Sequence, residues 1–194
     1  MTRNDQQPLS DKEMDQLLEL LEKVDGRKPL GTNLFNAISL IVVQPAVEAV
    51  WLCIAKSIHQ IDTSPHPSIN VYLTRRSTHD TAYPGQWHCP GSIQRAGEEI
   101  EDVFLRLAKR EEFDARLKRY EFVRNFNHTT EKRGHFQSMI YLCEFEKSEG
   151  GRGSWWPIDH LPSNTVLHHK EIIIPAAVGI FRSDHATELL LQNS

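Results

Sequence analysis

The 194-residue sequence predicts an α+β fold in which helices cover a mixed β-sheet. Two observations support this class. Strand-like apolar runs come first, and are followed by a long irregular segment, a helix, two more strands and a last helix. The composition, with 39% hydrophobic and 25% charged residues, is that of an ordinary globular domain large enough to bury a core.

The first predicted element is an amphipathic helix over residues 11–24. Ser10 and Glu13 have the spacing of a capping box, and Gly26 is positioned to end the helix. An apolar stripe follows at helical spacing: Met14, Leu17, Leu18 and Leu21. Such a stripe must cover either the core of its own domain or a partner subunit.

Residues 31–36 are interpreted as a linker to the first strands. Two apolar, β-branched runs, 37–44 and 46–54, are predicted as strands separated by Pro45. Residues 69–75 (INVYLTR) are predicted as a further strand.

Two irregular segments and one helix come next. Residues 56–68 are polar with two prolines and are expected to form a loop. Residues 77–97 contain so much proline and glycine that regular structure is excluded from most of them, and long loops in compact domains are usually functional or disordered. Residues 98–117 are predicted to be helical.

The last third of the chain is expected to add strands and a buried helix. Residues 119–126 and 135–146 read as strands joined by the polar turn NHTTEKRG. A glycine-rich turn over 149–154 leads to the segment WWPIDHLP, interpreted as a short edge strand and a tight turn. Residues 170–181 are apolar enough for a buried helix.

Charge and cysteine content exclude several classes of partner. The net charge of −4 gives no basic excess for binding a long nucleic acid, and no apolar stretch has the length of a membrane span or signal peptide. Three widely spaced cysteines do not suggest a disulfide framework, so we expect a cytoplasmic protein. None of the ten histidines has a zinc-finger spacing.

Chemistry-bearing residues concentrate between residues 69 and 113. A strand ends in Arg75-Arg76, and the loop Pro-Gly-Gln-Trp-His-Cys-Pro-Gly over 84–91 leads through Gly97-Glu98 into a helix. This segment resembles the Nudix hydrolases, whose motif is G-x5-E-x7-R-E-U-x-E-E-x-G-U, with U a bulky aliphatic residue. The later WWPIDHLP segment also resembles that family, and the resemblance covers roughly residues 37–181.

The Nudix motif aligns in two ways. In the preferred alignment three of seven fixed positions are kept, as Glu98, Arg106 and Glu111, whereas Leu107 and Arg110 stand where metal-binding glutamates are expected. The other alignment begins one helical turn later.

In that second alignment Arg110-Glu111 becomes the Arg-Glu pair and Asp114 replaces a glutamate. It places Glu112 at the aliphatic position and Ala115 at the final glutamate, and it leaves Glu98 four residues too far away.

The resemblance implies a Nudix fold, with a mixed sheet sandwiched between helices and an extra N-terminal helix. We expect a helical extension and linker over 1–34 and the Nudix domain over 35–194. The activity implied is cleavage of a diphosphate linkage in a nucleoside diphosphate derivative, such as a nucleotide sugar or dinucleotide, by metal-assisted attack of water.

The same resemblance assigns roles to six side chains. Magnesium or manganese prefers hard oxygen ligands and activates bound water, and carboxylates three or four residues apart share one helix face. The implied catalytic residues are Glu98, Arg106 and Glu111, with Glu98 and Glu111 as the metal ligands. The implied substrate-binding residues are Arg75, Arg76 and Arg110.

An internal feature of the helix supports an inward-facing acid. Glu111 falls on the same helical face as the apolar stripe of Ile100, Val103, Phe104, Leu107 and Ala108. Burial of an acid is costly unless the acid is paired or bound to metal, and the alternative is that the helix leaves the core by that turn.

The two departures from the motif favour a second hypothesis. Leu107 removes an oxygen ligand, and Arg110 exchanges a negative for a positive charge, which either weakens metal binding or holds substrate phosphate. The alternative function is therefore a catalytically impaired Nudix-fold module that binds a nucleotide or a protein. The apolar stripe of 11–24, together with the frequent pairing of Nudix proteins, leads to the hypothesis of a homodimer.

Overall fold

The computed structural model describes residues 8–54, 68–112, 117–145 and 151–192. The loop predicted over 56–68 lies almost entirely outside the described residues. Within them, no helix combines the length and apolar character that crossing a membrane would require.

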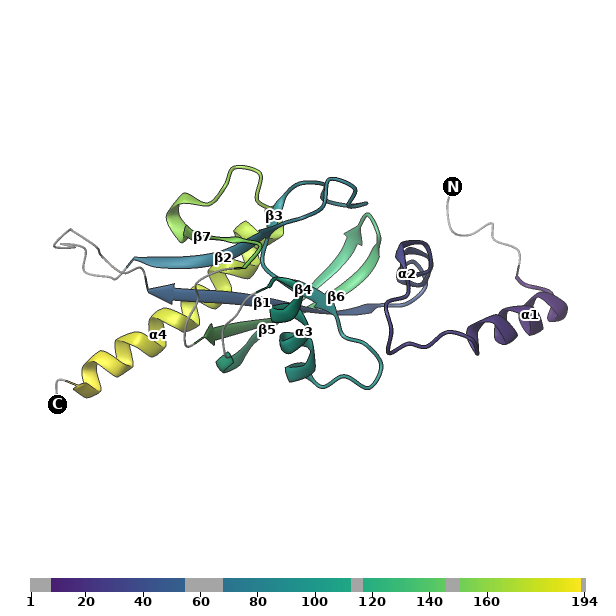
Figure 1. The fold of residues 1–194 in the computed structure, drawn as a ribbon, viewed down its shortest axis with the longest axis horizontal. Helices are drawn as coiled ribbons and strands as arrows, with labels where there is room; N and C mark the ends of the chain where they lie inside the picture. The colour runs from purple at the N-terminus through teal and green to yellow at the C-terminus, as the bar shows by residue number, and fades with distance from the viewer. Residues whose placement is uncertain (1–7, 55–67, 113–116, 146–150, 193–194) are drawn as a thin grey trace.

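A seven-stranded mixed sheet forms the centre of the molecule, with strand order β3-β2-β1-β6-β5 (Figure 1). The central pair, β1 and β6, is parallel, and the other pairings are antiparallel. The short strand β4 pairs with the first half of β1, and β7 pairs with β2. The strands are β1 (Gln44–Ile54), β2 (Ile69–Arg75), β3 (Trp87–His88), β4 (Gly91–Ile93), β5 (Leu117–Glu131), β6 (Gly134–Phe145) and β7 (Ser154–Pro157).

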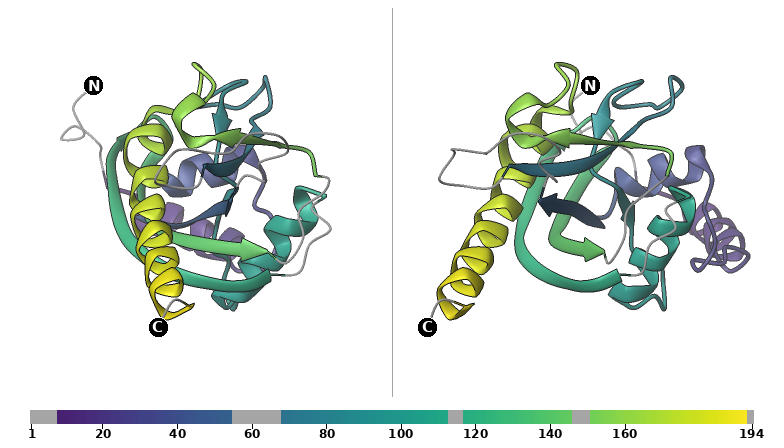
Figure 2. Two further views of the ribbon diagram at one scale, coloured as in Figure 1. Left: turned by 90° about the vertical axis from the view of Figure 1, so that its left-hand side faces the viewer. Right: turned by 60° about the vertical axis from the view of Figure 1, so that its left-hand side comes forward.

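Helices cover both faces of this sheet (Figure 2). One face packs against α4 and the helical turn before it, and the opposite face packs against α3. The α+β class and the layered fold predicted from the sequence are confirmed. The helical elements are α1 (Asp11–Leu21), α2 (Thr32–Ser39), α3 (Ile100–Arg110), the 3-10 turn η2 (Ile158–His160), the π-helical turn η3 (His169–Ile173) and α4 (Ile174–Gln192).

Alternation along β1 divides its side chains between the two cores. Val50 and Leu52 pack on the α4 side, whereas Val47, Ala49 and Trp51 pack on the α3 side. Glu48 lies two residues before Val50, so its side chain points to the same face of the sheet. On that face, the α4 side, Glu48 lies close to the helical turn η3. The sequence periodicity therefore directs a carboxyl group toward an apolar face.

The beginning of the domain differs from the sequence prediction. Residues 31–36 are not a linker, because α2 begins at Thr32, after Gly31 with a φ of 74°. Residues 37–43 are not a strand either: α2 continues to Ser39, and its Phe35 packs on Phe136 of β6 with ring centroids 6.2 Å apart. An apolar run suits a strand or a packed helix equally well, and this tertiary contact decides in favour of the helix.

Pro45 does not separate two strands. It is the second residue of the continuous strand β1, and its carbonyl accepts a hydrogen bond from Gln94 N–H. Proline is tolerated at this point because strand ends do not need every N–H donor.

The predicted helix 98–117 is shorter than expected. Helix α3 begins at Ile100, with a capping box between Glu99 and Asp102, and ends at Arg110. Glu112 has a positive φ of 52°, which is incompatible with continuing the helix, and Leu117 already belongs to β5.

Other predicted elements are found where the sequence placed them. Strand β2 spans 69–75 as expected, and the apolar C-terminal segment is helical from His169. The strands predicted over 119–126 and 135–146 are present but longer, because most of the predicted turn NHTTEKRG continues the β5–β6 ladder. The WWPIDHLP segment forms β7 and the turn η2.

Helix α1 has the predicted capping box but buries no residue. It lies beyond α2 at one end of the molecule (Figure 1). Its apolar stripe is exposed, with Leu17 40% and Leu18 52% accessible, so the stripe does not cover the core of its own domain.

Candidate functional site

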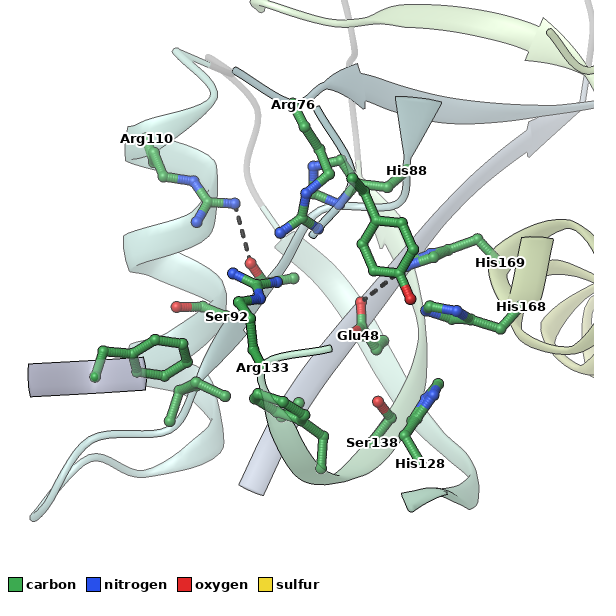
Figure 3. Close-up of a pocket in the computed structure, with 16 residues that line it drawn as sticks. Glu48, Arg76, His88, Ser92, Arg110, His128, Arg133, Ser138, His168 and His169 are labelled. Carbon is green, nitrogen blue, oxygen red and sulfur yellow. Dashed lines mark hydrogen bonds and ion pairs between the residues drawn. The ribbon is translucent and has the colours of Figure 1, made fainter. Parts of the chain in front are cut away.

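A polar cavity of about 230 Å³ opens beside the first half of β1 (Figure 3). Strands β1, β4 and β6, helix α2, the end of α3 and the turn before α4 all contribute to its walls. Figure 3 shows the guanidinium groups of Arg110 and Arg133 on one side of Glu48 and the rings of His168 and His169 on the other. The charged and histidine side chains that line it are Glu48, Arg76, His88, Arg110, His128, Arg133, His168 and His169.

The three arginines reach the cavity from three different parts of the chain. Arg76 directly follows β2, Arg110 ends α3, and Arg133 lies in the turn between β5 and β6. Asp80 orients two of them, because its Oδ2 atom lies 2.9 Å from a terminal nitrogen of Arg76 and 3.9 Å from one of Arg133. Burial raises the pKa of Asp80, but hydrogen bonds from Tyr83 N–H and Arg76 outweigh it and lower that pKa to about 2.

Arg76 has unused hydrogen-bonding capacity. Its side chain is 16% exposed, and its Nε is buried without a hydrogen-bond partner among the described residues. An unsatisfied buried donor on a guanidinium is unfavourable, and an anionic ligand that supplies an acceptor removes that cost.

Glu48 is the buried carboxyl group of the cavity. Its side chain is 13% exposed, and it accepts a hydrogen bond from Ser138 of β6. Burial raises the pKa of Glu48 to about 8, because the loss of hydration outweighs the attraction of Arg76, Arg110 and Arg133. At neutral pH this carboxyl group is therefore mostly uncharged and does not repel an anion.

The histidines beside Glu48 are also uncharged at neutral pH. Burial and nearby positive groups lower the pKa of both His88 and His169 well below the ordinary histidine value. His169 accepts a hydrogen bond at Nδ1 from Cys89 N–H, which places its proton on Nε2. That Nε2 lies 4.0 Å from the Glu48 carboxyl oxygen.

Gly91 is required by the position of Glu48. A Cβ atom at residue 91 would lie 2.3 Å from Glu48 Oε2 and 3.2 Å from Val47 O. Glycine in the Pro-Gly step of the loop thus lets the carboxyl group lie against the backbone of β4.

The structure joins Glu98 and Arg106 in a bidentate ion pair. Arg106 Nε donates to Glu98 Oε1 and one terminal nitrogen donates to Oε2, both at 2.7 Å. The same guanidinium also donates to Ser92 Oγ at 2.7 Å and to Ile93 O at 3.0 Å. This clamp fastens α3 to the loop before it, lowers the pKa of Glu98 through the Arg106 hydrogen bond, and favours the first of the two motif alignments.

Glu111 is buried as its helical face predicts, at 6% exposure. Arg110 Nε donates to Glu111 Oε1 at 2.9 Å, and the other side of this arginine donates to Gly91 O at 3.1 Å. Glu111 lines a cavity of about 500 Å³ next to the first one, together with Arg75, Arg76 and Arg110. The residues lining that cavity do not include Glu98, and Glu112 is instead an exposed partner of Arg152.

Comparison with known proteins identifies the architecture. The sequence matches no protein-family model and no curated protein. In structure, it is similar to the Nudix domain of NrtR from Shewanella oneidensis, solved with ADP ribose, at 18% identity and a TM-score of 0.52, over 84% of this chain and 97% of that one. The chain has the Nudix fold. A MutT/Nudix family protein from Listeria innocua is similar at 16% identity and a TM-score of 0.54, over 76% and 97% of the two chains.

Within the Nudix fold, the described side chains do not fit a magnesium site on α3. Of the expected carboxylates, Glu98 is held by Arg106 and Glu111 by Arg110, and Leu107 is a fully buried core residue. No three histidine, cysteine or acidic side chains in the described parts of the chain gather closely enough to hold a metal ion. A divalent cation there would have to displace two guanidinium groups from their carboxylate partners.

Sequence reasoning placed Arg76 and Arg110 at this Nudix-fold site but missed the other half of it. Glu48, Arg133 and His169 are separated by more than thirty residues from one another, and only the β1–β6 pairing and the start of α4 bring them together. One signal was available: Glu48 is the only charged residue in the otherwise apolar run of β1.

Proposed function

We propose that this Nudix-fold domain binds a phosphorylated small molecule in the cavity lined by Arg76, Arg110 and Arg133, without requiring a divalent cation. The observation that carries the proposal is the convergence of three guanidinium groups on one cavity, in which burial raises the pKa of the Glu48 carboxyl group to about 8. Guanidinium groups bind phosphate oxygens through strong charge-assisted hydrogen bonds.

The surroundings support binding of an anion rather than mutual neutralisation of charges. The carboxylate of Asp80 lies near both Arg76 and Arg133 and holds them at the edge of the same cavity. The buried Nε of Arg76 adds a donor that the described residues leave unsatisfied. A phosphate group would satisfy these donors with its several acceptor oxygens.

Adjoining cavities support a ligand larger than phosphate, such as a nucleoside diphosphate derivative. A cavity of about 690 Å³ shares Phe35, Ser92, Ile93 and Arg133 with the central one, and the 500 Å³ cavity beside Glu111 shares Arg76 and Arg110. The similar Nudix domain of NrtR was solved with ADP ribose, which is a ligand of this class.

Calorimetric titration with EDTA present tests the proposal. The probes are inorganic diphosphate, ADP ribose and a UDP-sugar. We expect at least one to bind, and Arg76→Gln to weaken that binding at least about tenfold because a charge-assisted hydrogen bond is lost. Arg27→Gln, at an exposed arginine that pairs with Asp25, is the matched control and should leave the affinity unchanged. Absence of binding by every probe would refute the proposal.

Metal-assisted hydrolysis of a diphosphate linkage is the second candidate function. The observation that favours it is that Glu111 is buried beside the same arginines, with Glu98 and Arg106 kept at their motif positions. Phosphate release from the same probes is measured with added Mg²⁺ or Mn²⁺. Turnover that is lost in Glu98→Gln and Glu111→Gln, while both variants stay folded, would establish this function; binding without turnover leaves the first proposal standing.

We further propose that α1 mediates a homodimer through its exposed apolar stripe. The support is that a helix with no buried residue exposes five large apolar side chains, which is unfavourable in an isolated monomer. The five are Met14, Leu17, Leu18, Leu20 and Leu21.

A further inference from the structure

We infer that two copies of this chain cover each other reciprocally, so that α1 of each copy packs on the apolar turn 40–43 of the other. This turn joins the end of α2 to the start of β1 and is called the α2–β1 turn below. The inference rests on the proposed homodimer through α1, and it names the surface that α1 contacts.

The α2–β1 turn exposes four consecutive apolar side chains. Ile41 is 80% exposed, and Leu40, Val42 and Val43 are each about half exposed. The turn has a defined shape, because the N–H groups of Ile41 and Val42 both donate to Ile38 O at 3.0 Å. A contiguous exposed apolar surface of this kind is typical of a site that another molecule covers.

Helix α1 does not cover this turn in its own chain. It buries none of its residues, and the segment after it packs against the loop before α3, where a Cβ atom at Gly26 would lie 3.3 Å from Ala96 Cβ. Figure 1 shows α1 beyond α2, at the end of the molecule where β1 begins. Two uncovered apolar surfaces therefore lie at the same end of the molecule without meeting within one chain.

The combined area of the two surfaces supports a reciprocal contact. Each of the five exposed apolar side chains of α1 offers on the order of 80 Å² for burial. Alone they would bury about 400 Å² per copy, which is half of the roughly 800 Å² that each partner buries in a standard interface. Adding the four side chains of the α2–β1 turn raises the area to about 700 Å² per copy, close to that standard.

The charge of α1 opposes its pairing with a second α1. The helix carries Asp11, Glu13, Asp15 and Glu19 against Lys12, so its net charge is −3. Two such helices packed against each other would bring like charges together, which is unfavourable.

The surroundings of the α2–β1 turn are better suited to an acidic helix. Residues 32–43 contain no charged side chain. The tip of the β5–β6 hairpin lies against the end of α2, since a Cβ atom at Gly134 would clash with Ser39 O, and this tip carries the exposed Lys132. An acidic helix would thus meet a neutral apolar surface with a cation beside it.

Sedimentation of two charge variants tests the contact. We expect the wild-type protein to be a dimer, with Leu18 of α1 facing Ile41 of the partner copy. Leu18→Lys and Ile41→Glu should each weaken association at least about tenfold, because each would bury a charge in an apolar contact. Both side chains are exposed in one chain, so both variants should keep the wild-type Tm.

Mixing the two variants distinguishes the reciprocal contact from other dimers. A mixed pair keeps one contact unaltered, and the other contact sets the introduced lysine against the introduced glutamate. The mixture should therefore associate at least about tenfold more tightly than either variant alone. Leu105→Glu, at a leucine of α3 that is 64% exposed, is the matched control and should sediment as the wild-type protein does.

The outcomes separate this inference from the homodimer on which it rests. A wild-type monomer would overturn both. A dimer that Leu18→Lys dissociates and Ile41→Glu leaves intact would overturn the contact with the α2–β1 turn, while the homodimer through α1 would stand. A mixture that associates no more tightly than the single variants would overturn the reciprocal contact as well.

Discussion

Replacing Glu48 with glutamine should change how the stability of the protein depends on pH. Burial raises the pKa of Glu48 from about 4.5 in the unfolded chain to about 8 in the folded protein. Between these values the folded state holds a proton that the unfolded state has released. Folding is therefore favoured below the unfolded pKa, and this contribution is lost as the pH rises through the folded pKa. Glutamine has a similar shape and does not titrate, so the variant should lack this loss.

The window from pH 6.5 to 8 isolates the effect best. Below pH 6.5, His88 and His169 make the protein less stable as the pH falls, which is opposite to the effect of Glu48. Their pKa values are lowered in the folded state, so the unfolded chain takes up protons that the folded protein does not. Above pH 8 the raised pKa values of the buried cysteines Cys89 and Cys143 add a loss of their own. A carboxyl group titrating at about 8 contributes on the order of 1.5 kcal/mol over this window.

Chemical denaturation of both proteins at pH 6.5 and pH 8 measures the difference. The wild-type protein should lose on the order of 1.5 kcal/mol more unfolding free energy than Glu48→Gln, a difference of several degrees in Tm for a chain of this size. Glu19→Gln, on exposed α1, should follow the wild-type protein. Parallel pH profiles for wild type and Glu48→Gln would refute the argument that this carboxyl group is buried and uncharged.

Three other perturbations have defined outcomes. Arg106→Ala should destabilise the domain by about 2–4 kcal/mol in denaturant unfolding, because it breaks a bidentate pair and leaves Glu98 without its cation; a cost under 0.5 kcal/mol would contradict the clamp. Gly91→Ala should lower the free energy of unfolding by about 1–3 kcal/mol, because the new Cβ atom would clash with the Glu48 carboxyl group. The loss should be smaller when Glu48 is also replaced by alanine, so an equal loss in the wild-type and Glu48→Ala proteins would disprove the clash. Leu18→Glu should convert a dimer to a monomer in sedimentation without lowering Tm, since this side chain is 52% exposed; a wild-type monomer would exclude the dimer.

Local patterns in the sequence determined those features that depend on near neighbours. The capping box of Ser10 and Glu13, the strand over 69–75 and the inward direction of Glu111 follow from spacings of a few residues, and the structure contains all three. The ion pair of Glu98 with Arg106 was not predicted from the sequence, although both residues lie within one short segment.

Tertiary structure alone decided the features that join distant segments. Whether residues 37–39 began a strand or completed α2 depended on Phe35 packing against Phe136, a contact across a hundred residues. The burial of Glu48, and hence its raised pKa, depends on the parallel pairing of β1 with β6 and on the turn that carries His169. Side-chain periodicity fixes which way a residue points, but the neighbours that it meets there are supplied by strands and helices far away in sequence, and these neighbours set its charge and its chemistry.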